Sequence, residues 1–217
     1  MLTNFVDHIY CINLEKRPER KEMFIKNLEE RAETSLEKVS IPKAVDGTTI
    51  SKEEMHSNYQ MNFPHYTRGA YGCFLSHINC VRDAKEKGFK KILIFEDDVT
   101  FVEGFKSKLE SFFSNLPGPW DTLWLGANFI SKPVEVAPGI ARVHSYAAHA
   151  YMLTENTYDT ILSWDVEAPI DVMYANTLQV KFRETTFHAN PRLCGQFAGF
   201  SDTEERETDH TGVLGSI

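Results

Sequence analysis

The sequence contains few cysteines, and they are not arranged in pairs. Cys11, Cys73, Cys80 and Cys194 are the four cysteines among 217 residues, and no two of them form a CxxC motif. Isolated cysteines of this kind are most often buried free thiols, and stable disulfides are rare in reducing compartments. We therefore expect free, buried thiols in a protein of a reducing compartment.

Long apolar runs are also absent. No segment approaches the roughly 18 consecutive apolar residues that a membrane-spanning helix requires. The opening segment MLTNFVDHIY has neither the basic start nor the apolar stretch of a signal peptide. We therefore expect no transmembrane segment and a cytoplasmic protein, either free or at the periphery of a membrane.

Basic residues are outnumbered by acidic ones. The chain has 23 lysines and arginines against 31 aspartates and glutamates, a formal net charge of −8. Because binding to nucleic-acid phosphates requires a basic face, nucleic acid is not an expected partner. Nothing in the composition indicates the oligomeric state.

Internal repeats, low-complexity blocks and Pro/Gly/Ser-rich linkers are absent as well. A chain of this length with 42% hydrophobic residues can bury a substantial core. We therefore predict one domain over residues 1–202, followed by a polar, flexible tail over residues 203–217.

Predicted strands and helices alternate along the first two-thirds of the chain. A β-branched and aromatic stretch at 6–14 predicts the first strand, Pro18 begins a helix, and a second strand is predicted over 39–45. The clearest helix follows Arg68 and ends at Gly88. The apolar face of the first helix comprises Met23, Phe24 and Leu28, and that of the long helix Phe74, Ile78 and Val81.

The same pattern continues after the long helix. Further strands are predicted at 90–95, 121–127, within 141–154 and within 180–188, and further helices at 103–115, from Thr154 to Trp164 and from Pro169. Alternation of strands and helices predicts an α/β fold with a mainly parallel central sheet and helices on both faces.

Three consecutive acids follow the apolar strand in KKILIFEDDVTF. Ligands of open α/β sheets bind beyond the carboxyl ends of the strands. Because side chains alternate along a strand, Glu96 and Asp98 can point the same way and Asp97 the opposite way. Two converging carboxylates suit a hard cation such as Mg²⁺ or Mn²⁺, which can clamp a diphosphate. The alternative that stays open is a solvated loop with ordinary acids.

Seven motifs occur in a fixed order between Val6 and Asp202. They are INLEKRPER, AVDG, GAYGCFLSH, ILIFEDDV, WDTLWLG, AYMLT and PIDVM. In this order the chain closely resembles glycosyltransferase family 25, which includes bacterial lipooligosaccharide galactosyltransferases and collagen galactosyltransferase domains. The resemblance implies a GT-A fold, which is a Rossmann-like single domain.

The resemblance also implies an activity. Members of this family transfer a hexose, usually galactose, from a UDP-sugar with inversion of configuration, and they use a divalent metal, commonly Mn²⁺ (or Mg²⁺). The acceptor is expected to be a hydroxyl of a glycan or glycoconjugate, as in lipopolysaccharide biosynthesis. Glu96 and Asp98 are the implied metal ligands, with Asp98 the firmer of the two.

Seven residues are candidates for binding the nucleotide sugar: Asn13, Arg17, Arg20, Asp46, Ser76, His77 and Asp97. Guanidinium groups can pair with phosphate oxygens or cover a uracil ring, although Arg17 can instead pair with Glu19 or Glu15 on the helix surface. Asp46 is equally a simple turn residue. A lone helix histidine such as His77 is more often packed in the core than functional.

Inverting transfer also requires a base that takes the acceptor proton. Asp171, in the family motif PID, is the first candidate, and Asp121 is the second. The alternative role of Asp171 is that of an acid at a helix N-terminus. His188 is the candidate third metal ligand, with Asp202 and His210 as alternatives. Trp120, Trp124 and Trp164 are candidates for stacking on a sugar, with Trp124 the one expected in the core.

One departure from the family pattern concerns the donor site. Family members usually carry an acid in Gly-Glu-x-Gly-Cys, where this sequence has Ala70, preceded by Arg68. This departure favours one alternative, a nucleotide-sugar-binding module without transfer activity. Two further alternatives stay open: a Mg²⁺-dependent phosphohydrolase, because acids after an apolar strand also serve that chemistry, and a transferase acting on modified DNA bases. The net charge of −8 argues against the last.

Overall fold

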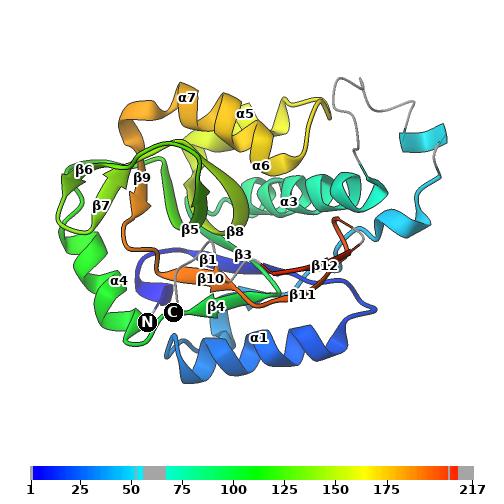
Figure 1. Cartoon of the computed structure of the whole chain (residues 1–217), viewed down its shortest axis with the longest axis horizontal. Coiled ribbons are helices and arrows are strands. Elements are labelled where there is room, and N and C mark those ends of the chain that lie inside the picture. The colour runs from blue at the N-terminus through cyan, green and yellow to red at the C-terminus, as the bar shows by residue number, and fades with distance from the viewer. Residues whose placement is uncertain (1, 52, 56–66, 205, 210–217) are drawn as a thin grey trace.

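An eight-stranded sheet lies between two layers of helices in the computed structural model of the chain (Figure 1). The structure describes residues 2–51, 53–55, 67–204 and 206–209. The strand order is β2-β1-β3-β8-β5-β9-β7-β6. The strands are β1 (His8–Ile12), β2 (Val39–Ser40), β3 (Lys91–Glu96), β5 (Thr122–Phe129), β6 (Val134–Ala137), β7 (Ile140–Arg142), β8 (Ser145–Thr154) and β9 (Thr186–Ala189).

Most strands of this sheet run in one direction. β1 is parallel to β2 and β3, and β5 is parallel to β9. β8 is antiparallel to its neighbours β3 and β5, and β7 is antiparallel to β9 and β6. Six of the eight strands therefore share a direction and only β7 and β8 are reversed, which confirms the predicted α/β class with a mainly parallel sheet.

Two short antiparallel sheets of two strands each complete the strands. β4 (Val99–Phe101) pairs with β10 (Cys194–Gln196), and β11 (Gly199–Ser201) pairs with β12 (Arg206–Thr208). In the described part of the predicted polar tail, 203–204 and 206–209, residues 206–208 form β12 of this second pair. The remaining tail residues, 205 and 210–217, lie outside the described residues, and the domain boundary stays a prediction.

The helices cover both faces of the sheet. α1 (Pro18–Glu30) and α4 (Phe105–Ser114) lie below it in Figure 1, and α3 (Arg68–Glu86), α5 (Tyr158–Leu162), α6 (Ile170–Met173) and α7 (Gln179–Lys181) lie above it. The remaining turns are η1 (Leu2–Asn4), η2 (Leu36–Lys38), η3 (Gly47–Thr49), η4 (Glu155–Thr157), the π-helical η5 (Tyr174–Leu178) and η6 (Arg183–Thr185). Within the described ranges, none of the helices has the length and apolar character needed to cross a bilayer.

Successive residues of β3 face the two helical layers in turn. Ile92 and Ile94 join a buried cluster with α3, α5 and α6, whereas Leu93 and Phe95 join a second cluster with α1 and α4. Because side chains of a strand alternate between its faces, one apolar run supplies both halves of the core. The strand is therefore rigidly held up to Glu96, where the acidic segment begins.

The sequence at the start of α3 fits a close contact with the AVDG loop. Thr67 caps the helix by accepting a hydrogen bond from the backbone N–H of Ala70 at 2.9 Å. A Cβ atom on Gly72 would lie 2.5 Å from the carbonyl oxygen of Val45, and one on Gly47 would lie 1.9 Å from that of Arg68. Only glycines allow the loop and the helix to approach this closely.

Three local predictions were wrong. Met23 is 43% exposed, because the buried face of α1 is formed by Phe24 and Leu28. The second strand is confined to Val39–Ser40, because pairing with β1 is interrupted after Ser40 and returns only as an isolated bridge between Lys43 and Asn13. Thr154 does not cap the following helical turn with its side chain, because its hydroxyl donates a hydrogen bond to Asp121 instead.

Candidate active site

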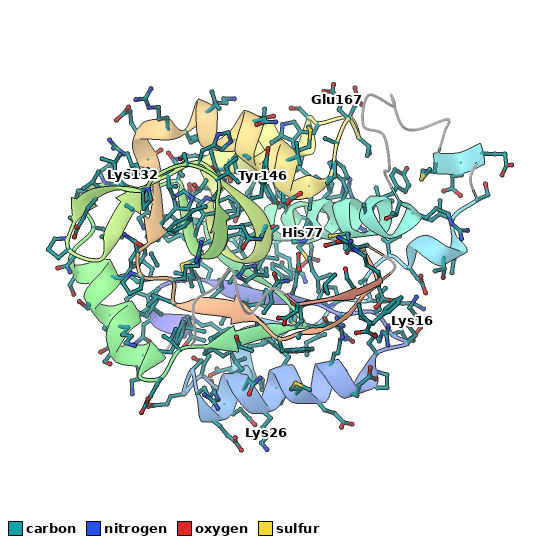
Figure 2. The ribbon with its side chains drawn as sticks, viewed as in Figure 1. Lys16, Lys26, His77, Lys132, Tyr146 and Glu167 are labelled. Atoms are coloured by element: carbon teal, nitrogen blue, oxygen red, sulfur yellow. The ribbon has the colours of Figure 1, made fainter. Side chains whose placement is uncertain are left out.

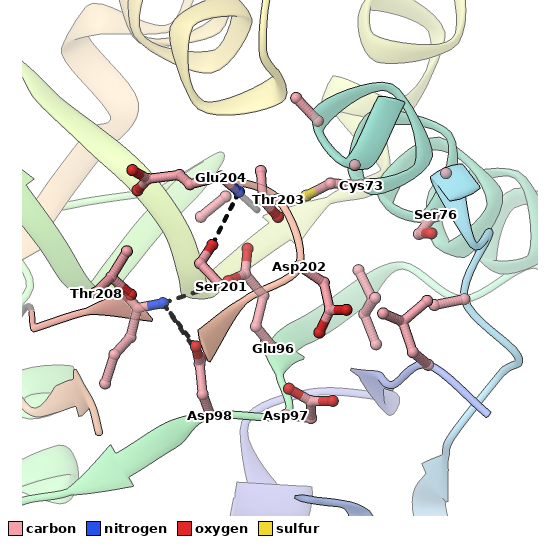
Figure 3. A pocket seen from close by; sticks show the side chains of 18 of the residues that line it. Cys73, Ser76, Glu96, Asp97, Asp98, Ser201, Asp202, Thr203, Glu204 and Thr208 are labelled. Atoms are coloured by element: carbon pink, nitrogen blue, oxygen red, sulfur yellow. Dashed lines mark hydrogen bonds between the residues drawn. The ribbon is translucent and has the colours of Figure 1, made fainter. Parts of the chain in front are cut away.

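A cleft opens at the carboxyl ends of β1 and β3, where β3 ends at Glu96 and Asp97 and Asp98 follow (Figure 3). Its water-accessible volume is about 250 Å³. The walls are formed by the segment after β1, by residues 44–48, by the first turns of α3 and by residues 196–204. Because β8 is reversed, its first residues, including Ala147 and Ala148, lie at the same edge.

Glu96 and Asp98 converge on one point of this cleft. The amide nitrogen of Gln196 lies 3.4 Å from Oε2 of Glu96 and 3.2 and 3.3 Å from the two carboxylate oxygens of Asp98. Burial, then the charges of Glu96 and Asp97, raise the pKa of Asp98 to about 7. A divalent cation stabilises two carboxylates held this close, so the pair fits a hard metal ion.

Asp97 has different partners from the other two acids. Asn13 donates a hydrogen bond to its Oδ2 at 2.7 Å, and Arg20 donates one to its Oδ1 at 3.1 Å. Burial raises the pKa of Asp97, and the bonds from Asn13 and Arg20 oppose that rise. Asp97 and Asn13 therefore fix the end of β1 and the start of α1 against the end of β3.

The basic residues before and at the start of α1 are paired with acids. Nε of Arg17 donates to Oδ2 of Asp202 at 2.9 Å, and this bond raises the pKa of Arg17. Nζ of Lys16 lies 3.4 Å from Oδ1 of Asp202 and 3.1 Å from Oδ2 of Asp46. These pairs tie the C-terminal segment to the first loop and leave Lys16 on the cleft wall.

Two aromatic rings lie against the arginines. The guanidinium carbon of Arg17 is 5.5 Å from the ring centre of Phe200, and that of Arg20 is 5.4 Å from the ring centre of Phe197. Phe200 lines the cleft and is 37% exposed. An exposed ring with a guanidinium against one side is a surface that suits a nucleobase or a sugar ring.

Asp46 and Ser76 hold the AVDG loop in place. Ser76 accepts a hydrogen bond from the backbone N–H of Val45 at 2.8 Å and donates one to the carbonyl of Gly72 at 2.7 Å. Asp46 caps η3 by accepting from the backbone N–H of Thr48 at 2.9 Å. Both residues line the cleft. Asp46 can therefore cap this turn and contact a bound ligand at the same time.

His77 is completely buried between α3 and the sheet (Figure 2). Its Nδ1 lies 2.7 Å from the hydroxyl of Tyr151, and its Nε2 lies 3.3 Å from Oε1 of Glu96. Burial lowers the pKa of His77 to about 3, so the ring is neutral. His77 is not among the residues that line the cleft, and it contacts the cleft through Glu96.

Asp171 lies on the cleft wall at the start of α6. Its Oδ2 accepts from the backbone N–H of Ala147 at 3.2 Å, and its Oδ1 accepts from that of Val172 at 2.9 Å. Ala147 has a φ of +72°, a left-handed conformation that costs energy for a residue with a Cβ. Burial raises the pKa of Asp171, which favours its uptake of a proton.

The chain matches a known protein family over most of its length. The profile of glycosyltransferase family 25, described as an LPS biosynthesis protein, matches residues 6–168. This chain belongs to glycosyltransferase family 25. The family that the sequence motifs indicate is therefore confirmed.

Several curated proteins resemble this family 25 chain. Human procollagen galactosyltransferase 2 is 28% identical over 239 residues, which cover 91% of this chain and 37% of the relative. A bovine probable inactive glycosyltransferase 25 family member 3 is 30% identical over 165 residues, which cover 68% of this chain and 27% of the relative. The chain thus spans about a third of the length of these relatives.

A solved structure shares the fold. It is that of a glycosyltransferase involved in the glycosylation of the major capsid of PBCV-1, and it superposes with a TM-score of 0.53. The match has 12% sequence identity and covers 91% of this chain and 95% of that chain. At this identity the likeness shows the fold alone, and it agrees with the Rossmann-like GT-A class predicted for family 25.

Several predicted site residues are not among those that line the cleft of this family 25 chain. Asn13, Arg17 and His77 contact acids that do line it, namely Asp97, Asp202 and Glu96. His188 and Asp121 lie away from the cleft. His188 is buried on β9, which is three strands from β3 in the sheet, or roughly 14 Å at the usual strand spacing. It lies 2.8 Å from the hydroxyl of Ser145 and stacks on Trp124, so the structure does not support it as a metal ligand. Asp121 precedes β5 at the opposite edge of the sheet and accepts hydrogen bonds from Thr154 and Thr185.

Asp202 lines the cleft and holds the first loop through ion pairs. It forms the ion pairs with Arg17 and Lys16, which occupy its carboxylate. His210, named with Asp202 as a possible metal ligand, lies outside the described residues. Trp124 is buried in the core, as expected.

The family acid's position, Ala70, also lines the cleft. Alanine in place of the family acid therefore leaves one carboxylate fewer on the wall on which Cys73 and Asp171 lie. Arg68 is not among the residues that line the cleft, and its guanidinium donates to the carbonyls of Thr48 and Ile50 at 3.4 and 3.3 Å.

Several cleft residues were not predicted from the sequence, among them Lys16, Cys73 and Gln196. Lys16 stands in the same KRPER segment as Arg17, and its basic charge was the available signal. Cys73 lies four residues before His77, a spacing that places both on one helix face. Gln196 carried no signal, because only the pairing of β10 with β4 brings it to the acids.

Proposed function

We propose that this chain is a metal-dependent inverting glycosyltransferase that moves a hexose, galactose being the first choice, from a UDP-sugar to an acceptor hydroxyl. A glycan or glycoconjugate is the proposed acceptor. Membership of family 25 and likeness to a procollagen galactosyltransferase support this proposal. The single observation that carries it is the convergence of Glu96 and Asp98 at the carboxyl end of β3.

Glu96 and Asp98 would hold the divalent cation, Mn²⁺ or Mg²⁺. Their carboxylates meet within hydrogen-bond reach of one nitrogen, and burial together with the charge of Glu96 raises the pKa of Asp98 to about 7. When bound, the cation would supply positive charge that stabilises the diphosphate of the leaving UDP. Gln196 would orient the pair through its amide, and His77 would orient Glu96 from the buried side.

The donor would lie along the basic and aromatic wall. Lys16 and Arg20 offer charged N–H groups to the diphosphate, and Phe200 offers a ring face to the uracil or the sugar. Asp46 lies 3.1 Å from Lys16 and can accept hydrogen bonds from a ribose. This assignment uses cleft residues at the end of β1, where nucleotides bind in Rossmann-like folds.

Asp171 would serve as the general base. It stands on the α6 side of the cleft, and backbone N–H groups of Ala147 and Val172 fix the orientation of its carboxylate. Its raised pKa, caused by burial, strengthens it as a proton acceptor for the acceptor hydroxyl. Attack from this side, opposite the leaving diphosphate, inverts the configuration of the sugar carbon.

A screen of UDP- and GDP-sugars tests this function. The measured quantity is nucleoside diphosphate released with and without Mn²⁺, for the wild type and for Asp98→Asn. We expect release from a UDP-hexose that requires both Mn²⁺ and Asp98. Phosphate release from simple phosphate esters, with no preference for uridine, would instead indicate a phosphohydrolase.

A second candidate function is a nucleotide-sugar-binding module without transfer. Two observations favour it: Ala70 stands where family members carry an acid, and several relatives are named as inactive members of the family. It requires metal-dependent binding of UDP-sugar with no turnover in any acceptor screen. Substitution Ala70→Glu would then be expected to restore donor hydrolysis.

A further inference from the structure

A sulfur, a nitrogen and an oxygen ligand atom come together beside the acidic pair. They are Sγ of Cys73, a ring nitrogen of His77 and a carboxylate oxygen of Glu96, and all three lie within 4.8 Å of one another. Cys73 and His77 are one turn apart on α3, so they share a helix face, and that face lies against the end of β3. The sulfur of Cys73 enters the same pocket as Glu96 and Asp98 (Figure 3).

His77 is held in the orientation of a metal ligand. Its Nδ1 is hydrogen-bonded to the hydroxyl of Tyr151 at 2.7 Å, and Tyr151 is in turn bonded to Tyr174 at 2.8 Å. An outer hydrogen bond of this kind fixes the ring that presents its other nitrogen to a metal. That nitrogen, Nε2, lies 3.3 Å from Oε1 of Glu96, which matches the roughly 3.3 Å between two ligands of a tetrahedral ion.

We propose that Cys73, His77 and Glu96 form a binding site for a transition metal that prefers thiolate and imidazole ligands, such as Zn²⁺. Zn²⁺ takes Cys, His and carboxylate ligands, and in catalytic sites three protein ligands leave a fourth position open. Cys73 and Glu96 both line the cleft, so that position faces a ligand or water. On binding, the metal–sulfur bond replaces the thiol S–H bond, and the proton leaves to solvent.

The site is chemically distinct from the proposed site of Mn²⁺ or Mg²⁺. Hard cations prefer oxygen ligands, whereas sulfur and imidazole select zinc and its neighbours. The two sites nevertheless share Glu96, because its Oε1 faces His77 while its Oε2 faces Gln196, which also contacts Asp98. Zn²⁺ bound at Cys73 would therefore compete with Mn²⁺ for Glu96, a consequence that rests on the proposed function.

Titration of the metal-free protein with Co²⁺ tests the site itself, because a cobalt–thiolate bond gives a near-ultraviolet charge-transfer band. We expect the wild type to develop this band with one Co²⁺ per chain and to lose it on addition of Zn²⁺. Cys73→Ser removes the sulfur and should abolish the band. Cys80→Ser is the matched control on the same helix, and it should keep the band because Cys80 lies in the core cluster.

His77→Gln provides a second readout. It should weaken Co²⁺ binding by at least about tenfold, since the ring nitrogen and its support from Tyr151 are lost. A folded wild type with no band would overturn the proposal, as would a band that survives in Cys73→Ser or disappears in Cys80→Ser. The assay needs no donor sugar, so loss of the proposed transferase function leaves its result interpretable.

Discussion

At the scale of single residues, Asp98 links stability to function. Burial and then Glu96 raise its pKa from 3.8 to about 7. In metal-free protein the unfolded chain therefore loses this proton at lower pH than the folded chain does. The free energy of unfolding should fall as pH rises between about 4 and 7, with the full penalty present above 7.

Asp98→Asn should remove that penalty. Asparagine keeps an oxygen that accepts from Gln196 but does not ionise, so the variant in EDTA should be more stable than wild type by roughly 2–4 kcal/mol at pH 8. At pH 4 the difference should be small. Chemical denaturation at both pH values measures it, with Glu135→Gln, an exposed acid on β6, as the control. Equal stabilities of Asp98→Asn and wild type at pH 8 would contradict this account of the acidic pair.

Asp171 gives a second prediction at this scale. Asp171→Asn retains the shape and the oxygen that accepts from Ala147 but cannot take a proton, so transfer should fall by about 10²–10⁴-fold. Metal-dependent binding of UDP should persist, because the carboxylate of Asp171 is hydrogen-bonded to backbone N–H groups on the α6 side and not to the acidic pair. Transfer kinetics and UDP titration on the same preparation separate these effects. A variant that transfers normally would remove Asp171 from the mechanism.

At the scale of elements, the contact between the AVDG loop and α3 shapes the donor site. A Cβ on Gly72 would lie 2.5 Å from the carbonyl oxygen of Val45, which is backbone and cannot turn aside. Gly72→Ala should therefore shift the loop, cost about 1–3 kcal/mol of stability and weaken UDP binding. Gly118→Ala is the control, because a Cβ there meets no described atom within 4 Å. If Gly72→Ala binds UDP as wild type does, the loop does not form the donor site.

The sequence predicted most elements because their signals are local. The apolar run before Glu96 and the spacing of Phe74, Ile78 and Val81 indicated β3 and α3 nearly to the residue. The position of His188 was not predictable in this way. Its strand reads as an ordinary strand, and only the sheet order places β9 beside β5 and away from β3.

In the candidate site, too, some residues could be predicted from local sequence patterns and others could not. Glu96, Asp98 and Asp171 stand in motifs with a chemical reason, and the fold brings each of them to the cleft. Gln196 reaches the acids through β10, whose pairing with β4 no sequence pattern shows. Ala147 orients Asp171 with a left-handed backbone that alanine does not signal.

At the scale of the whole molecule, the fold gathers distant segments at one edge of the sheet. The end of β3, the start of α1, the first turns of α3 and residues 196–204 all line one cleft. Arg17 and Asp202 connect two of these segments across 185 positions of sequence. The reversed direction of β8 adds its first residues to the same edge, which brings Asp171 to the wall through Ala147.

The central claim is that Glu96 and Asp98 hold a divalent ion that grips the diphosphate of the donor. Isothermal titration of UDP with and without Mn²⁺, on wild type and Asp98→Asn, tests it most directly. We expect wild type to bind UDP only weakly without Mn²⁺ and at least about tenfold more tightly with it, a gain of about 1.4 kcal/mol, and we expect Asp98→Asn to lose that gain. Equal UDP affinity of wild type with and without Mn²⁺ would contradict the claim.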